Sequence, residues 1–462
     1  MRVSYLLAIL SVILGLVSCD SGSTAGPPNV LFVVVDTLRA DAVLKSRENV
    51  PVMPKLTAFA RESVYFTNAV TPSSWTRPAM ASVFTSLDVD VHGVIFSSRR
   101  DGDTTTTDLL PASLRTIATE LKEKGYKTFG VQTNGNLSAD IGFNRDFDSY
   151  FYSVDAPANT ITDAALNAIK DATSPYFLYV HYIDPHAPYN PPKQYESVFG
   201  GRSPLSEGDK KAADDSLEYL KDKVYDVLRI QDVRKFSAIS PQGREELKRR
   251  YDEDCRFTDD ELARLLASIK KSHPNTIIVI MSDHGEEFWE HGSMGHGTTM
   301  YAEQVDVPLM FNAPGLSPAV NAETVSTLDV VPTIFKLLGY SPSPNWQGRD
   351  LFDPNRKLSE EFAFGRSQGP DSRFGVDCEM VQQGKWKLVH DLKHGITELF
   401  DTELDPEEKQ NRIGAEPDIA KKLGAALDER NALNSQHPLR QRTNSAPVDN
   451  ELMQDLKAIG YN

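Results

Sequence analysis

The sequence predicts an α/β fold in which helices cover both faces of a mostly parallel sheet. Short apolar runs rich in Val, Ile and aromatic residues are typical of buried parallel strands, and helical patterns lie between them. Strands and helices that alternate in this way indicate an α/β/α sandwich. With 40% hydrophobic and 25% charged residues over 462 positions, the composition is that of an ordinary globular protein with a large core.

Five apolar runs are expected to form strands of this sheet, and these are residues 30–35, 127–132, 177–183, 276–281 and 307–311. A helical pattern covers residues 114–124 and stops at Gly125. A second helix is expected to begin at Ser240 and Pro241, which are a good cap and first-turn pair. One face of this second helix is apolar and carries Leu247, Tyr251, Leu262, Leu265 and Ile269.

The chain is expected to divide into a main domain, residues 29–350, and a small C-terminal α+β subdomain, residues 351–462. Within the main domain, residues 201–245 are charged and poorly patterned, which indicates an insertion. The subdomain is expected to contain short strands and a closing helix. These segments are residues 379–389, 397–401 and 452–459.

Residues 1–18 are typical of a lipoprotein signal peptide. Arg2 is followed by an apolar run too short to span a bilayer, and the Leu-Val-Ser before Cys19 resembles the bacterial lipobox. Lipid on Cys19 and a flexible tether over residues 19–28 would hold the protein to a membrane of the cell envelope, outside the cytoplasm. Asp20 favours the periplasmic face of the inner membrane. The alternative is a soluble secreted protein with a chance Cys at the cleavage site.

The net charge and the two cysteines other than Cys19 each support a further prediction. The net charge of −16 and a pI near 5.1 argue against nucleic acid, which is bound by basic surface. Cys255 and Cys378 are predicted to be buried free thiols, with a disulfide between them as the alternative.

Polar residues follow three of the predicted strands at the point where each strand ends. Asp36 comes directly after the first strand, and Asp283 and His284 follow the run 276–281. A third group stands at and past the end of the run 177–183 and consists of His181, Asp184 and His186. Ligands of open α/β sheets bind at the carboxyl ends of strands, and carboxylate with imidazole suits a divalent cation. Taken singly, Asp36 could equally cap the next helix.

The segment Ser-Ser-Trp-Thr-Arg-Pro that ends at Pro78 offers a nucleophile. Because proline is tolerated only in the first turn of a helix, Thr76 is expected at the helix cap. There the helix amides favour an anion, and a neighbouring metal would activate the hydroxyl. The alternative is a plain N-cap threonine.

Motifs in order along the chain resemble the sulfatase family of the alkaline phosphatase superfamily, from residue 28 to residue 462. NVLFVVVDTLRAD resembles the opening strand with the first metal-ligand Asp, and TRPAMASVFTS resembles the Cys/Ser-x-Pro-x-Arg nucleophile segment. VHYIDPHAPYNPP resembles the substrate-binding His loop, and SDHGEEFWEHGSMGHG the second metal segment. KWKLVHD, ELFDTELDPEEKQN and LKAIGYN are similar to the C-terminal subdomain. The resemblance implies an alkaline-phosphatase-like fold.

The resemblance also implies the roles of individual residues. It makes four side chains ligands of a divalent metal ion, and these are Asp36, Thr76, Asp283 and His284. Mixed nitrogen and oxygen ligands favour zinc or manganese, with calcium as a further possibility. Thr76, His186 and His296 would be the catalytic residues. The substrate would contact His181, Asp184, His186 and His296.

Four departures from the family pattern concern the reaction. Thr76 stands where sulfatases have the Cys or Ser that is oxidised to formylglycine. Met80 replaces the Arg of that motif, Thr37 replaces a second Asp, and a segment that includes Asn134 replaces Gly-Lys-Trp-His. With threonine at position 76, the implied ligand set of Asp, Thr, Asp and His resembles that of the phosphodiesterases and phosphoglycerol or phosphoethanolamine transferases of the superfamily.

The sequence therefore predicts a metal-dependent hydrolase of phosphoric (mono- or di-) or sulfuric esters that acts through a covalent Thr76 intermediate and prefers phosphoesters. Its substrate would be a small molecule or a glycan or lipid ester. The alternatives are a sulfatase that works without formylglycine, a transferase of the kind just named, and a non-catalytic surface lipoprotein.

Overall fold

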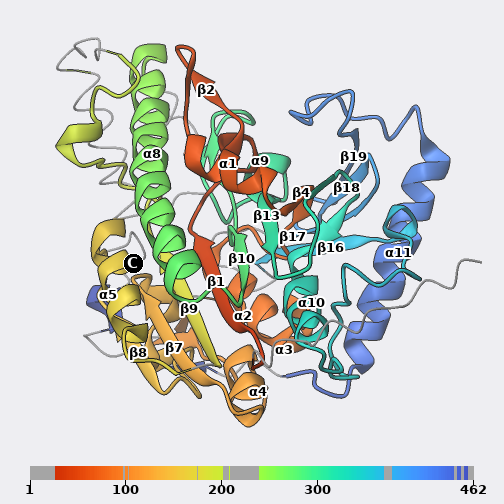
Figure 1. The fold of residues 1–462 in the computed structure, drawn as a ribbon. Coiled ribbons are helices and arrows are strands. Elements are labelled where there is room, and N and C mark those ends of the chain that lie inside the picture. The colour runs from red at the N-terminus through yellow and green to blue at the C-terminus, as the bar shows by residue number, and fades with distance from the viewer. Residues whose placement is uncertain are drawn as a thin grey trace, which may run out of the picture.

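A computed structural model describes residues 26–462 except for nine gaps, namely 97–98, 102–103, 174, 201–207, 209–238, 369–376, 442–444, 449–451 and 456–462. Its centre is a twisted nine-stranded sheet flanked by helices on both faces (Figure 1). The strands of this sheet are β1 (Asn29–Val35), β4 (Val64–Val70), β7 (Lys127–Gln132), β8 (Ser149–Tyr152), β9 (Tyr176–Tyr182), β10 (Thr276–Met281), β13 (Asp306–Asn312), β14 (Ala319–Asn321) and β15 (Val325–Ser326).

The sheet is mixed but mostly parallel, and its strand order is β14-β4-β13-β10-β1-β9-β7-β8, with β15 also beside β4. The predicted fold class is thus confirmed. The prediction that residues 307–311 form a parallel strand is wrong, because β13 runs antiparallel to both β10 and β4. A parallel neighbour needs a crossover connection, whereas only a short hairpin and the four-residue helix α9 (Ala302–Val305) lie between β10 and β13.

Two layers of helices bury the alternate side chains of the central strands. In β1, Leu31, Val33 and Val35 face one layer, and the residues between them face the other. The first layer consists of α1 (Pro54–Arg61), α5 (Ala158–Ile169) and α8 (Pro241–Ser272). The second consists of α2 (Thr76–Thr85), α4 (Ile117–Glu123) and α10 (Val330–Leu337), and the short α3 (Val89–His92) follows α2.

Both predicted helices are present. α8 is capped by Ser240, whose side chain accepts a hydrogen bond from the amide of Gly243 at 3.1 Å, and its predicted apolar residues are all buried. The helix predicted over residues 114–124 begins three residues later, because Thr116 forms a capping box with Thr119 and so sets the start of α4.

The C-terminal part forms a four-stranded antiparallel sheet covered by one long helix. Its elements are β16 (Ala363–Gln368), β17 (Asp377–Gln383), β18 (Trp386–Asp391), β19 (Ile396–Asp401) and α11 (Pro417–Gln436). The predicted strand segment 379–389 is in fact a hairpin of β17 and β18, since Gly384 adopts a positive φ of 54° and turns the chain. One face of this sheet packs against the main core and the other against α11.

Three small sheets complete the described part. They are β2 (Ser46–Arg47) with β3 (Val50–Pro51), β11 (Glu287–Phe288) with β12 (Met294–Gly295), and β5 (Arg99–Asp101) with β6 (Thr104–Asp108) and β20 (Ser445–Pro447).

Several predictions concern segments near the gaps. The signal peptide, Cys19 and most of the tether lie outside the described residues, as does the predicted insertion 201–245 apart from 208 and 239–245. Of the closing helix, residues 452–455 are described and are helical. Cys255 and Cys378 are buried free thiols, which confirms the prediction. Within the described ranges, no helix has the length and apolar character to cross a membrane.

Candidate active site

The carboxyl ends of three neighbouring parallel strands meet at one edge of the central sheet. Val34 of β1 pairs in register with Met281 of β10 and with His181 of β9. Asp36 follows β1 at the edge where Asp283 follows β10, and His181 stands next to last in β9. The residues predicted from the ends of these apolar runs therefore lie together at one edge of the sheet.

Asp36, Asp283 and His284 form a buried group that fits a divalent cation. Their ligand atoms all lie within 4.8 Å of one another. Asp36 Oδ1 and Asp283 Oδ2 have no hydrogen-bond partner among the described residues, and they lie 3.6 Å and 3.5 Å from His284 Nε2. His284 Nδ1 donates to the carbonyl of Gly285 at 2.9 Å, which leaves the lone pair of Nε2 directed at the group. Buried oxygens without donors, facing an imidazole nitrogen, are the ligands that a cation would satisfy.

The pKa values of Asp36, Asp283 and His284 also favour a bound cation. Burial by itself raises the pKa of Asp36, but the hydrogen bond from His181 and the nearby imidazoles hold it below the usual value of a carboxyl. Burial and the negative charge of Asp36 raise the pKa of Asp283 well above its usual value. Burial and the neighbouring His296 lower the pKa of His284, so its ring is neutral. Only a bound cation would let both carboxylates carry their charge together.

Thr76 lies against this group at the start of α2. The sequence predicts Thr76 at the cap, which is wrong by one residue: the cap is Trp75, whose backbone is extended, and Thr76 is the first residue of the helix. Its side chain is therefore not used to cap α2. Instead, Thr76 Oγ1 lies 3.2 Å from His284 Nε2, in a fully buried position beside the metal-binding group.

Asn134 is a site residue that the sequence analysis noted only as a departure from the family pattern. It follows β7, which runs parallel to β9, so it stands at the same edge of the sheet. Its Nδ2 lies 2.6 Å from Asp36 Oδ2 and 3.2 Å from Thr76 Oγ1. Its place just after a parallel strand was the signal that could have identified it.

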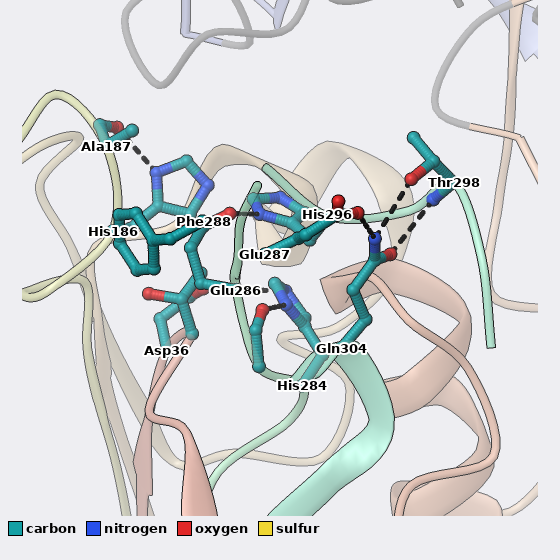
Figure 2. A network of polar contacts seen from close by, with 12 residues as sticks. Asp36, His186, Ala187, His284, Glu286, Glu287, Phe288, His296, Thr298 and Gln304 are labelled. Carbon is teal, nitrogen blue, oxygen red and sulfur yellow. Dashed lines mark hydrogen bonds and ion pairs between the residues drawn. The ribbon is translucent and has the colours of Figure 1, made fainter. Parts of the chain in front are cut away.

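Two further imidazoles stand over the metal-binding group. Figure 2 shows His186 and His296 above Asp36, with His284 beside it. The ring centroids of His296 and His284 are 4.3 Å apart, and those of His296 and His186 are 5.0 Å apart. His296 Nδ1 lies 3.0 Å from Glu286 Oε1. Burial disfavours a charged His296, but Glu286 outweighs it and raises the pKa of the ring.

The other two predicted substrate residues have partners within the protein. His181 Nε2 lies 3.0 Å from Asp36 Oδ2, and its Nδ1 lies 2.7 Å from the hydroxyl of Tyr179. These contacts fix the orientation of the Asp36 carboxylate. Asp184 Oδ2 accepts the amide of Ala158, the first residue of α5, at 2.8 Å, and burial raises the pKa of this carboxyl to about 7.

His291, the remaining histidine of the segment SDHGEEFWEHGSMGHG, contacts residues outside the site. Its Nδ1 lies 2.7 Å from Glu303 Oε1, and its ring stacks on Tyr301 with centroids 3.8 Å apart. Of the three histidines in that segment, the structure thus brings His284 and His296 to the site and places His291 in contacts outside it.

Comparison with known proteins agrees with this geometry. The family model named Sulfatase matches residues 28–340, well over half of the chain. The chain belongs to the sulfatase family. Members of this family are ester hydrolases, and so is this protein. Sulfatases are generally metal-dependent, and Asp36, Asp283 and His284 form a group that could hold a metal ion.

Curated sulfatases and solved structures cover most of the chain at low identity. An arylsulfatase of Clostridium perfringens is 22% identical and aligns with 84% of this chain and 91% of its own length. A choline-sulfatase of Rhizobium meliloti is 23% identical, with 84% and 83% covered. A 2-O GAG sulfatase superposes with a TM-score of 0.69 at 17% identity, covering 89% of this chain and 93% of that one. A phosphonate monoester hydrolase of Silicibacter pomeroyi superposes with a TM-score of 0.67 at 18% identity, covering 91% and 99%. These structural matches concern the fold.

Proposed function

We propose that this sulfatase-family hydrolase cleaves phosphoric or sulfuric esters through a covalent ester of Thr76, with phosphoric esters preferred. The observation that carries the proposal is the contact of Thr76 Oγ1 with His284 Nε2 at 3.2 Å, inside the buried Asp and His group. When bound there, a divalent cation, with zinc or manganese favoured over calcium, supplies a lower pKa for the hydroxyl and charge for a substrate oxygen.

Phosphorus is favoured over sulfur because Thr76 carries no group that can become formylglycine. An ester on threonine is released only when water attacks its central atom, and this attack is the ordinary route for phosphate esters. Phosphonate monoester hydrolases are among the structural neighbours, which agrees with such a substrate, although the names of the sequence relatives are those of sulfatases. A sulfatase that acts without formylglycine is therefore the second candidate.

His186 and His296 are proposed to act directly on the ester. His296, which Glu286 favours in the charged form, would donate a proton to the departing alkoxide. His186 would bind a non-bridging oxygen. His181 and Asp184, which the resemblance implies as further substrate residues, would act through the positions of Asp36 and α5.

An activity panel tests both the reaction class and the nucleophile. Protein that begins after residue 28 would be assayed with aryl phosphate, phosphodiester, phosphonate and sulfate substrates, each with zinc, manganese or calcium. Thr76→Ala should lose activity by orders of magnitude, and Thr76→Ser should retain part of it. Mass spectrometry of trapped enzyme should find phosphate on the peptide that contains Thr76.

Two results would contradict the proposal. Near wild-type turnover by Thr76→Ala would exclude Thr76 as the nucleophile. A preference for the aryl sulfate over every phosphorus ester would favour the second candidate.

A further inference from the structure

We infer that Asn134 is a further catalytic residue, whose side-chain amide donates a hydrogen bond to Thr76 Oγ1 and stabilises that oxygen as it is released from the covalent ester. The inference rests on the proposed function of Thr76. It assigns a neutral donor to the reacting oxygen, which also lies 3.2 Å from His284 Nε2.

The orientation of the Asn134 amide follows from its own hydrogen bonds. Asn134 caps the short 3-10 helix Gly135–Leu137, and its Oδ1 accepts the backbone amide of Asn136 at 2.8 Å. With Oδ1 occupied in this way, Nδ2 must face Asp36 and Thr76. An amide nitrogen carries two hydrogens, and one goes to Asp36 Oδ2 at 2.6 Å and the other to Thr76 Oγ1 at 3.2 Å. All of these groups are fully buried, so water does not compete for the donor.

A buried arginine holds this donor at a fixed distance from the nucleophile. Arg77, which is the residue after Thr76, donates from Nη2 to Asn136 Oδ1 at 3.0 Å. Its Nη1 binds Thr107 and the carbonyls of Phe96 and Asp108. Through Arg77, the first turn of α2, which also carries Thr76, is hydrogen-bonded to the loop that carries Asn134. Arg77 is a positioning residue in this arrangement.

The charge on Thr76 Oγ1 changes in opposite directions in the two half-reactions. In the first, the Oγ1 alkoxide forms a bond to the central atom of the ester, and the departing alkoxide leaves with its electron pair and takes a proton from His296. In the second, a water oxygen bonds to the central atom, its proton passes to His296, and the electron pair of the broken bond returns to Oγ1. A donor beside Oγ1 therefore lowers the barrier of the second half-reaction, in which negative charge develops on that atom.

This asymmetry gives a kinetic test. With an aryl ester at saturating metal, Asn134→Ala should slow steady-state turnover on the order of 100-fold, the loss typical when one donor to a developing oxyanion is removed. The first turnover, measured by rapid mixing, should remain fast. Aryl product should then appear in a burst equal to the enzyme concentration, and the Thr76 ester should accumulate in quenched samples.

Two comparison variants separate this role from a structural one. Asn134→Ser keeps an N-cap oxygen for the amide of Asn136, but its shorter side chain does not reach Thr76 Oγ1, so it should fold and also accumulate the ester. Asn159→Ala removes an exposed side chain of the same type from α5 and should behave as wild type.

Three outcomes would overturn the inference. The first is turnover by Asn134→Ala within about threefold of wild type, well short of the loss expected for such a donor. The second is full recovery on raising the metal concentration, which would mean that Asn134 only supports Asp36. The third is equal slowing of both half-reactions with no accumulated ester. If Thr76→Ala is itself active, the proposed function has failed; if it is inactive and Asn134→Ala is unaffected, only this inference has failed.

Discussion

Replacing Asp283 by Asn should make the metal-free protein more stable and at the same time remove its response to metal. In the wild type, Asp283 is buried beside Asp36, and its Oδ2 has no hydrogen-bond partner within the described residues. An asparagine has the same shape, and its oxygen can keep the 3.0 Å hydrogen bond from the amide of His284. The substitution removes a negative charge without creating a cavity.

The separation of the two carboxylates gives the magnitude. Their ligand oxygens lie within 4.8 Å. Two like unit charges at about that distance repel each other by about 3 kcal/mol when the effective dielectric constant is about 20. Relief of this repulsion should raise the melting temperature of the metal-free protein by about 5 °C, given the usual shift per kcal/mol in large chains.

The loss of stability that Asp283 causes in the metal-free protein should grow as the pH rises. Burial and Asp36 raise the pKa of Asp283 in the folded state, so the folded metal-free protein holds a proton that the unfolded chain has already released. The stability of the metal-free wild type should therefore fall as the pH rises above the unfolded pKa of about 3.9. Asp283→Asn should lack this contribution, and the gap between the two proteins should widen toward neutral pH.

Calorimetry of chelated protein, before and after addition of zinc or manganese, measures both effects. The wild type should gain stability on metal addition, because the ion binds only the folded site. Asp283→Asn should gain little. Asp329→Asn alters a buried carboxylate that pairs with Arg356 away from the ligands, and it should keep the full metal response. The reasoning is refuted if metal-free Asp283→Asn melts no higher than metal-free wild type, or if metal raises both equally.

The remaining predictions concern the proton donor and the N-terminus. Glu286→Gln should lower the pKa of His296, since Glu286 raises it, and the alkaline limb of the pH–rate profile should move to lower pH; an unchanged limb would show that His296 is not the acid. A fatty-acid analogue should label the full-length precursor in a bacterial host but not its Cys19→Ala variant, and equal labelling of both would exclude lipidation at this position.

The convergence of Asp36, Asp283 and His284 could be predicted from the sequence because the strands before them are strongly apolar. Residues 30–35 and 276–281 read unambiguously as buried strands, and parallel strands bring their carboxyl ends to one edge. A single polar residue at such an end is ambiguous, but Asp36 and Asp283 with His284 form a set. The direction of β13 was not predictable in the same way, because a strand buried on both faces has the same apolar pattern in either direction.

The residues that the sequence did not reveal lack such a pattern. Asn134 stands in a short polar segment with glycine, which is typical of an ordinary turn, and Arg77 would be expected on the surface by its charge. Both are fully buried, and Arg77 donates to the side chain of Asn136 in the loop that carries Asn134. α11 was also missed for lack of a pattern, since its only buried residues are Leu423, Leu427 and Asn434, and three positions give little periodic signal.

The departures from the sulfatase pattern at positions 76, 80 and 134 are consistent with one another under the proposed reaction. A formylglycine hydrate ejects sulfate by elimination, which needs a base for its second hydroxyl, whereas a threonine ester needs an attacking water and a donor where Oγ1 is released. Asn134 can donate but cannot act as such a base, and Met80 lies fully buried in the apolar core, where it brings no charge to the site. Changing Thr76 to Cys would therefore restore the residue that formylglycine requires without restoring the surroundings in which an aldehyde hydrate could turn over.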